Sequence, residues 1–281
     1  MMMAVSMVVF GTLGPFVRKI AVSSGELALY RAVLASVLIG GYLLLSGQKI
    51  PFAKIKKEVP LLLASGVAMG INWIFLFEAY KYTTVSVATL SYYFAPVIVM
   101  VVCPLIFKER LTGKQILCFA MATAGLVLIT GTAGGGKQDL LGIAFGLAAA
   151  AFYATVMLLN KFIKGVMGLH RTFIQFLSAI VVLVPYVACT SGFTLGGLSG
   201  TGWTNLLIVG LVHTGITYCM YFTALKELPG QKVAILSYID PLVAVLVSVV
   251  LLNEGMTLPQ MIGGVLILGF TLWSELPKRK K

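Results

Sequence analysis

The chain has 281 residues, of which 59% are apolar and only 11% are charged, and its mean hydropathy is +1.00. Soluble domains carry about 25% charged residues, so this composition excludes a water-facing globular surface and predicts that lipid surrounds most of the chain. The formal net charge of +12 does not indicate a nucleic-acid partner. The lysines and arginines lie in short clusters between apolar runs, where they suit topology signals and contacts to membrane lipids.

Ten apolar runs follow one another along the chain, each of a length that suits a membrane-spanning helix of about 20 residues. We expect helices at residues 2–20, 26–46, 59–80, 84–106, 113–131, 138–159, 169–190, 203–224, 231–252 and 257–275. The segments between them are too short to form a domain. The expected fold is therefore all-α and integral to the membrane, with ten transmembrane helices.

The positive charges predict how these helices cross the membrane. Of the 21 lysines and arginines, 16 fall on one side when the N-terminus is placed in the cytoplasm. The other side holds Arg18, Lys19, Arg31, Lys81 and Lys137. Because positive residues are enriched in cytoplasmic segments, we expect an even number of spans with both termini cytoplasmic. The expected location is the cytoplasmic (inner) membrane of a bacterium.

The sequence repeats itself at an offset of 145 residues, which places 77–115 on 222–260. Nine of these 39 aligned positions are identical, and six of the nine involve Lys, Tyr, Pro, Glu, Thr or Gln, which shared hydrophobicity does not explain. We therefore expect two five-helix repeats, residues 1–136 and 137–281. Because five is odd, the second repeat enters the membrane in the opposite orientation, as in many secondary transporters that work by alternating access. A duplicated membrane protein without a transport role is the alternative.

The sequence carries no motif that indicates catalysis. It lacks a phosphate-binding glycine loop and the HExxH and GxSxG patterns. The four cysteines have neither metal-ligand nor redox spacing, and three of them lie inside apolar runs. We therefore expect no enzyme activity, no cofactor and no metal site. The expected partners are a small-molecule substrate and membrane lipids, and both a monomer and a dimer stay open.

Several segments resemble one family of membrane transporters. They are GTLGPFVR (11–18), LALYRAVLA (27–35), FEAYKYTTVSVATLSYYFAPV (77–97) and KERLT (108–112), with FTALKELPGQKVAILSYIDPL (222–242) and NEGMT (253–257) in the second half. They resemble the EamA-type members of the drug/metabolite transporter superfamily over essentially the whole chain. The resemblance implies a ten-helix transporter that exports small solutes. Within the superfamily these solutes include amino acids, other metabolites and drugs, and relatives move nucleotide-sugars and sugar-phosphates.

Polar side chains inside apolar runs predict a substrate cavity, because such side chains usually face the interior of a helix bundle. A stripe of five lies on one face of the expected helix 203–224, and two more occupy repeat-related positions in 59–80. These residues are His213, Thr214, Thr217, Tyr218 and Tyr221, with Asn72 and Trp73. The alternative is that they bind helix to helix without a substrate.

Two prolines are expected to interrupt helices beside the same cavity, since proline removes a backbone donor. We expect Pro96 and Pro241 to act as hinges. The tyrosines before them are expected to line the substrate path, and an acidic residue directly precedes the second proline: Tyr92, Tyr93, Tyr238 and Asp240. Asp240 is either a proton carrier or the partner of a nearby polar group. Glu109 and Glu254, which end the corresponding spans, are expected to take part in turn and cap chemistry.

The first two helices add further candidates. Gly11, Gly14 and Pro15 interrupt the first and are expected to serve close packing and bending. Arg31 and Glu78 fall toward the same side of the membrane, where we expect them to form a structural ion pair, with a clamp for a substrate carboxylate as the alternative.

These observations predict a secondary transporter that exports small organic metabolites, with amino acids or related amphipathic solutes as the leading class. The solute class follows from the aromatic residues of the expected cavity, and the direction follows from the family resemblance. A multidrug or nucleotide/sugar-type transporter of the same fold and a non-transport membrane protein are the alternatives. Uniport and proton coupling both stay open.

Overall fold

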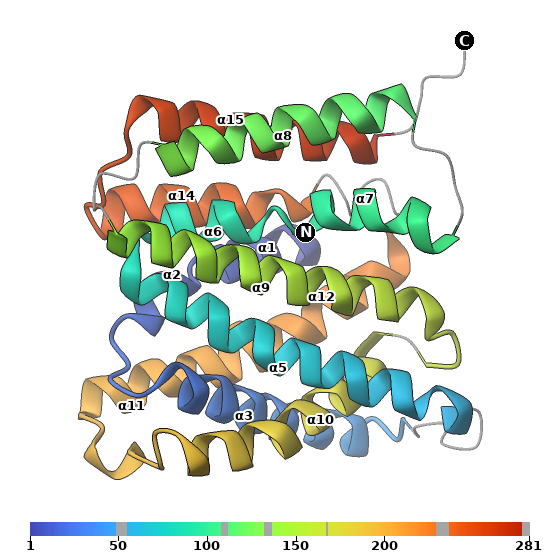
Figure 1. The fold of residues 1–281 in the computed structure, drawn as a ribbon. Helices are drawn as coiled ribbons and strands as arrows, with labels where there is room; N and C mark the ends of the chain where they lie inside the picture. Colours follow the sequence, from blue (N-terminus) through green and yellow to red (C-terminus); the bar gives the residue numbers. More distant parts are fainter. Residues whose placement is uncertain (49–54, 108–111, 132–136, 167, 229–235, 277–281) are drawn as a thin grey trace.

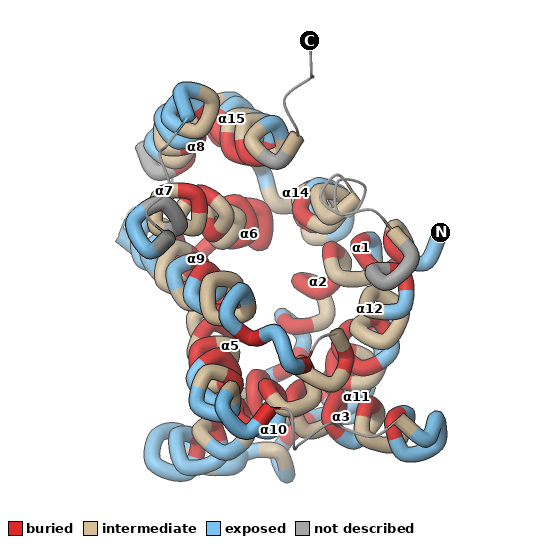
Figure 2. Tube along the Cα trace, turned by 90° about the vertical axis from the view of Figure 1, so that its right-hand side faces the viewer, coloured by how far each residue is buried: buried red, intermediate tan, exposed pale blue. Residues whose placement is uncertain are grey.

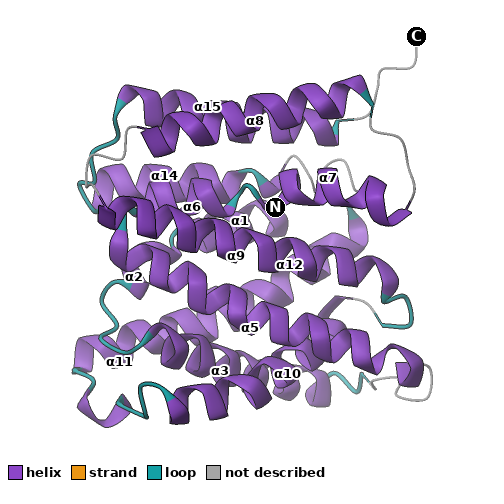
Figure 3. Ribbon diagram, viewed as in Figure 1, coloured by secondary structure: helices purple, strands orange, loops and turns teal. Residues whose placement is uncertain are grey.

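The computed structural model describes residues 1–48, 55–107, 112–131, 137–166, 168–228 and 236–276. Within these ranges the regular structure is entirely helical (Figure 3). The first half contains α1 (Met2–Gly11), α2 (Leu13–Val17), α3 (Ser24–Leu45), η1 (Lys56–Glu58), α5 (Val59–Tyr82), α6 (Val85–Tyr92), α7 (Ala95–Phe107) and α8 (Gly113–Gly131). The second half contains α9 (Lys137–Phe162), α10 (Gly168–Cys189), η2 (Leu195–Gly197), α11 (Gly200–Leu207), η3 (Ile208–Ile216), α12 (Thr217–Glu227), α14 (Ile239–Leu251) and α15 (Leu258–Glu275).

The expected all-α membrane class is confirmed by the helices themselves. In the described part of the chain, 6 helical segments are long and apolar enough to cross a membrane by length and composition. Shorter apolar helices of 10–17 residues lie at Met2–Gly11, Gly113–Ile129, Ile239–Leu251 and Leu258–Ser274. Each of the ten runs predicted from the sequence contains a helix, although residues 231–235 of the ninth run lie outside the described residues.

Several of the predicted helices are interrupted, either near a proline or at a stretch with π-helical turns. The first run bends at Thr12, between α1 and α2, three residues before Pro15. The fourth breaks into α6 and α7 just before Pro96, because proline cannot donate to the preceding turn. The eighth passes from α-helix to the π-helical η3 and back to α12, which widens its turns.

The helices form a bundle with a layered cross-section. Helices α8 and α15 pack against each other at one edge, and α3, α10 and α11 lie at the other (Figures 1 and 2). Seen along the bundle, α5, α6 and α9 stand on one side and α1, α12 and α14 on the opposite side (Figure 2). Close packing at the α8–α15 edge depends on glycine, because a Cβ on Gly125 would lie 2.6 Å from the carbonyl oxygen of Gly263.

Candidate functional site

A cavity of about 490 Å³ lies between the two sides of the bundle. Its lining comes from α1, α2, α3, α5, α6, α7, α9, α10, α12 and α14, and thus from both halves of the chain. Its lining extends from Asn160 and Arg171, near the end of α9 and the start of α10, to Tyr80 and Val85 at the opposite end of the bundle. Its volume falls in the range of about 300–1,000 Å³ that is usual for small-molecule sites.

Aromatic side chains build two walls of this cavity. On one wall, Tyr218 packs edge-on against Phe10 at a centroid distance of 5.2 Å and against Phe176 at 5.5 Å. On the other, Tyr92 stacks on Tyr153 at 5.2 Å and meets Tyr93 edge-on at 5.7 Å. Such contacts hold each ring in a fixed orientation. The cavity therefore offers preformed apolar surfaces with hydroxyl groups at their edges.

Arg31 is the buried cation of the cavity, with 4% of its surface exposed. Its Nε donates a hydrogen bond of 2.7 Å to the hydroxyl of Thr214. Its guanidinium carbon lies 4.7 Å from the centroid of the Trp73 ring and 5.6 Å from that of Phe77, so the cation rests on aromatic faces. The side chain is thus fixed from two directions while it lines the cavity.

The predicted ion pair between Arg31 and Glu78 is wrong. Glu78 accepts a hydrogen bond of 2.5 Å from Ser24 Oγ and pairs with Lys81 at 3.1 Å. Helix α3 begins at Ser24, so Arg31 lies about 10 Å deeper along the axis at 1.5 Å per residue. The two charges occupy different depths of the bundle, a difference that residue order alone did not reveal.

Asp240 is the acidic residue among the cavity's described lining residues, and its carboxylate accepts a hydrogen bond from the Tyr93 hydroxyl. Of the two roles considered for Asp240, the structure provides the polar partner. Tyr93 lies in the break between α6 and α7, and Asp240 follows the turn at Tyr238, so the bond joins α14 to the α6–α7 junction. Tyr238 and Pro96 also line the cavity, and Pro241 is buried in α14.

Asn72 and Trp73 line the cavity as the sequence predicted, and Asn72 Nδ2 donates to the carbonyl oxygen of Ala149 at 2.6 Å. Tyr218 and Tyr221 line it as well. Through these four residues α5 and α12 both line the same cavity, as their repeat-related positions predicted.

His213, Thr214 and Thr217 do not belong to the cavity lining, contrary to the prediction of a single polar stripe. The π-helical turn changes their direction: the hydroxyls of Thr214 and Thr217 donate to carbonyl oxygens five residues earlier, at 2.8 and 2.7 Å. His213 Nε2 lies 3.0 Å from the hydroxyl of Thr12. A stripe counted at the α-helical period therefore grouped with the cavity residues three buried side chains that bond within their own span or to neighbouring helices.

The glycines of the first span allow close packing, as expected. A Cβ on Gly11 would lie 2.5 Å from the carbonyl oxygen of Asp240, and one on Gly14 would lie 2.6 Å from Val85. Both residues also line the cavity. Any larger side chain would push α1 and α2 away from α14 and α6.

Sequence reasoning missed a polar group of residues at the end of the cavity formed by α9 and α10. Gln175 Nε2 donates to Ser65 Oγ at 2.6 Å and to Asn160 Oδ1 at 2.8 Å, while Arg171 lines the cavity beside them. Gln175 was detectable as an amide inside the apolar run 169–190. Asn160 and Arg171 lie near helix ends, where polar residues are common and give no signal.

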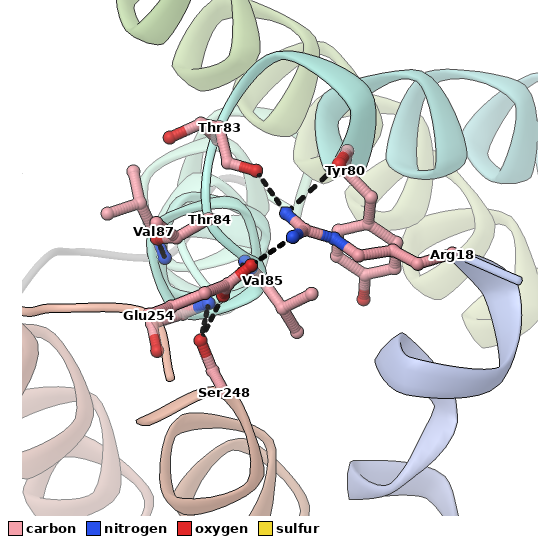
Figure 4. A network of polar contacts seen from close by, with 9 residues as sticks. Arg18, Tyr80, Thr83, Thr84, Val85, Val87, Ser248 and Glu254 are labelled. Carbon is pink, nitrogen blue, oxygen red and sulfur yellow. Dashed lines mark hydrogen bonds and ion pairs between the residues drawn. The ribbon is translucent and has the colours of Figure 1, made fainter. Parts of the chain in front are cut away.

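At the opposite end of the bundle, a network joins α2 to α6 and α14 (Figure 4). Glu254 forms an ion pair with Arg18 and accepts hydrogen bonds from Ser248 and from the backbone N–H of Val85, the last at 2.8 Å. Arg18 also donates to the carbonyl oxygen of Thr83 at 2.8 Å. We call this group the Arg18 network. The carboxylate at the start of α6 also faces the positive end of that helix.

The Arg18 network extends the role predicted for Glu254. Turn and cap chemistry was expected, and the structure shows that Glu254 caps a helix of the other half of the chain and pairs with a third helix. Its repeat mate, Glu109, lies outside the described residues.

Comparison with known proteins gives a consistent family. A sequence profile described as the EamA-like transporter family matches residues 1–131 and 140–274. An uncharacterized transporter of Bacillus subtilis (strain 168) is 31% identical over 268 residues, which cover 94% of this chain and 85% of the relative. A protein of Escherichia coli (strain K12) named "Probable amino-acid metabolite efflux pump" is 28% identical over 235 residues, 77% of each chain.

A solved structure extends the likeness to the fold. A protein whose crystal structure is known superposes with a TM-score of 0.68 at 17% sequence identity, covering 99% of this chain and 98% of the other. At this identity the likeness concerns the fold alone. The profile match and the Bacillus relative together cover both halves of the cavity described above.

Proposed function

Since the chain belongs to the EamA-like transporter family, we propose that this membrane transporter is a ten-span secondary exporter of amino acids or related amphipathic solutes. The cavity is the observation that carries the proposal. Its aromatic walls suit an apolar side chain, while Arg31 and Asp240 provide a positive and a negative group in the same space. A free amino acid carries both charges together with a side chain.

Pairwise helix contacts support two inverted repeats, residues 1–136 and 137–281. In such a protein α1–α2 corresponds to α9, α3 to α10, α5 to the α11–η3–α12 span, α6–α7 to α14, and α8 to α15. The contact of α5 with α9 then has its counterpart in α12 with α1, and that of α3 with η3 in α10 with α5. The pairs α8–α15 and α3–α10 map onto themselves. Residues matched by the family profile divide at the same place.

We propose that transport occurs by alternating access, and the contrast between the two ends of the cavity supports this. The Arg18 network ties three helices together at one end, while the cavity reaches the other end at Asn160 and Arg171. In our proposal both termini are cytoplasmic in a bacterial inner membrane, so the cavity faces the cytoplasm and the Arg18 network closes the outer end. An exporter would load its substrate in this state.

The test is flux of radiolabelled amino acids in liposomes that contain the purified protein, with and without a pH gradient. Trp73→Ala and Tyr218→Ala remove cavity walls and should lower saturable flux about tenfold or more, since buried aromatic anchors contribute several kcal/mol to binding. Trp203→Ala and Tyr186→Ala are matched controls, because these rings are 39% and 42% exposed and lie outside the cavity lining.

Two outcomes would contradict this proposal. Flux that never exceeds that of empty liposomes for any amino acid would remove amino acids as the substrate class. Equal losses in the cavity variants and the control variants would separate the flux from the cavity. A dependence on the pH gradient would favour proton coupling over uniport.

A further inference from the structure

Arg31 carries a buried charge that forms no ion pair with an acidic residue in the described part of the chain. The ion pairs there join Arg18 to Glu254 and Lys81 to Glu78, and Arg31 takes part in neither. Charged side chains inside a membrane protein are costly and usually pair or serve a function. A structural role alone would not explain why this cation stays without a carboxylate while only 4% of its surface is exposed.

The fixed position of Arg31 leaves its binding edge free. Thr214 holds Nε, and the Trp73 ring covers one face of the guanidinium. Among the described residues, the two terminal nitrogens have no hydrogen-bond partner, and the residue lines the cavity. A guanidinium has a planar edge of donors that matches the two oxygens of a carboxylate.

The charges that share the cavity favour an anionic group on the substrate. Its described lining contains Arg31 and Arg171 as cations and Asp240 as the acid. Asp240 accepts a hydrogen bond from Tyr93, a neutral donor, and forms no ion pair with Arg31. The lining is therefore positive on balance, with Arg31 held deep among the aromatic residues.

We propose that Arg31 is the specificity-determining residue of the cavity and binds the carboxylate of the transported solute through its two terminal nitrogens. Thr214 and Trp73 act as positioning residues that keep the guanidinium edge directed into the cavity. This inference rests on the proposed transport function but specifies more, because it requires a carboxylate and excludes uncharged and purely cationic substrates.

The first experiment measures binding in the purified full chain, without transport. Thermal unfolding is recorded with 3-phenylpropionate and with its uncharged amide, 3-phenylpropanamide. The carboxylate should stabilise the wild type and the amide should not. Arg31→Gln should weaken carboxylate binding by about tenfold to a hundredfold, the loss expected for hydrogen bonds to a charged group. Arg31→Lys keeps the charge and should retain part of the preference.

Positioning is tested with Thr214→Val, which removes the acceptor of the Nε bond together with the hydroxyl's own bond to the carbonyl oxygen of Val209. This variant should bind 3-phenylpropionate more weakly than the wild type does, and its response to the amide should be unchanged. Lys19→Gln is the control, since Lys19 is an exposed cation outside the cavity lining. The unfolding midpoint of each variant without added compound, compared with that of the wild type, shows whether the variant is folded.

Flux of phenylalanine and of phenylalaninamide in liposomes separates the two proposals. Equal stabilisation by carboxylate and amide, or a preference that survives Arg31→Gln, would overturn the role of Arg31 even if transport occurs. Carboxylate binding that depends on Arg31 without any amino-acid flux would support this site and overturn the proposed transport of amino acids. An organic phosphate that binds better than the carboxylate would overturn the substrate chemistry.

Discussion

Two arginines on neighbouring helices of the first half lie in contrasting surroundings. Arg18 lies at the end of the bundle with 34% of its side chain exposed, and it meets a carboxylate and two backbone carbonyls. Arg31 is buried to 4% exposure and meets one hydroxyl and two aromatic faces. The more exposed cation has an ion pair and two further acceptors, and the more deeply buried cation forms no ion pair.

This difference indicates that Arg18 has a structural role within the protein and that Arg31 is able to bind a ligand. Taking an arginine out of water costs several kcal/mol, which a carboxylate repays in part. In the Arg18 network, Glu254 provides this favourable interaction from within the chain. Arg31 forms no ion pair, so the carboxylate of a substrate would provide the interaction there. Variants that change the surroundings of one arginine at a time therefore test whether the two residues differ in role.

The largest effect on stability is expected from Glu254→Ala. The change removes the ion pair to Arg18 and the acceptor for Val85 N–H and Ser248. We expect a loss of about 2–3 kcal/mol in the free energy of unfolding, measured by titration with SDS, because a buried N–H and a cation both lose their partner.

The same variant should also loosen the Arg18 end of the cavity. Spin labels at Lys19→Cys and Gly255→Cys, in a chain without its native cysteines, would show longer and broader distances in Glu254→Ala. A Cβ on Gly255 meets no atom within 4 Å, so the label itself should not disturb the fold. Glu78→Ala is the control for the distance measurement, since Glu78 contacts Ser24 and Lys81 and takes no part in the Arg18 network. An unchanged distance distribution would contradict the closing role of the Arg18 network.

A smaller effect, of opposite sign for the two arginines, is expected when each is replaced by methionine. Arg31→Met removes an unpaired buried charge, so the free energy of unfolding should stay unchanged or rise by about 1 kcal/mol while carboxylate binding is lost. Arg18→Met leaves Glu254, whose side chain is 8% exposed, without its cation and should lower stability by about 1–2 kcal/mol. If Arg31→Met destabilised the protein more than Arg18→Met, Arg31 would be a structural residue.

Apolar runs and prolines made much of this architecture predictable. The length of an apolar run identifies a membrane-spanning helix, because the thickness of the bilayer sets how many residues such a helix needs. Pro96 and Pro15 marked interruptions because a missing N–H acts locally. Trp73 and Tyr218 could be predicted to line one cavity because they occupy repeat-related positions.

The wrong predictions share one cause: they depended on positions in space that the order of residues does not reveal. Pairing Arg31 with Glu78 assumed that two charges on the same side of the membrane lie at the same depth, and the register of α3 placed them apart. The stripe containing His213 assumed one helical period, whereas η3 has π-helical turns. The contacts of Glu254 with Arg18 and with α6 join segments 236 and 169 residues apart in the chain, so no local pattern contains them.

The smallest effect is expected from Ser248→Ala, which probes the Arg18 network without removing a charge. Ser248 Oγ accepts a hydrogen bond of 3.2 Å from the backbone N–H of Ser86 and donates to Glu254. Its loss leaves one N–H at the start of α6 unpaired, so the free energy of unfolding should fall by about 1 kcal/mol. Ser36→Ala is a matched control, because the Ser36 hydroxyl is buried without a hydrogen-bond partner among the described residues and its removal should cost almost nothing. Equal effects of the two substitutions would mean that Ser248 stabilises α6 only by packing, and that Arg18 and Glu254 close this end of the cavity without it.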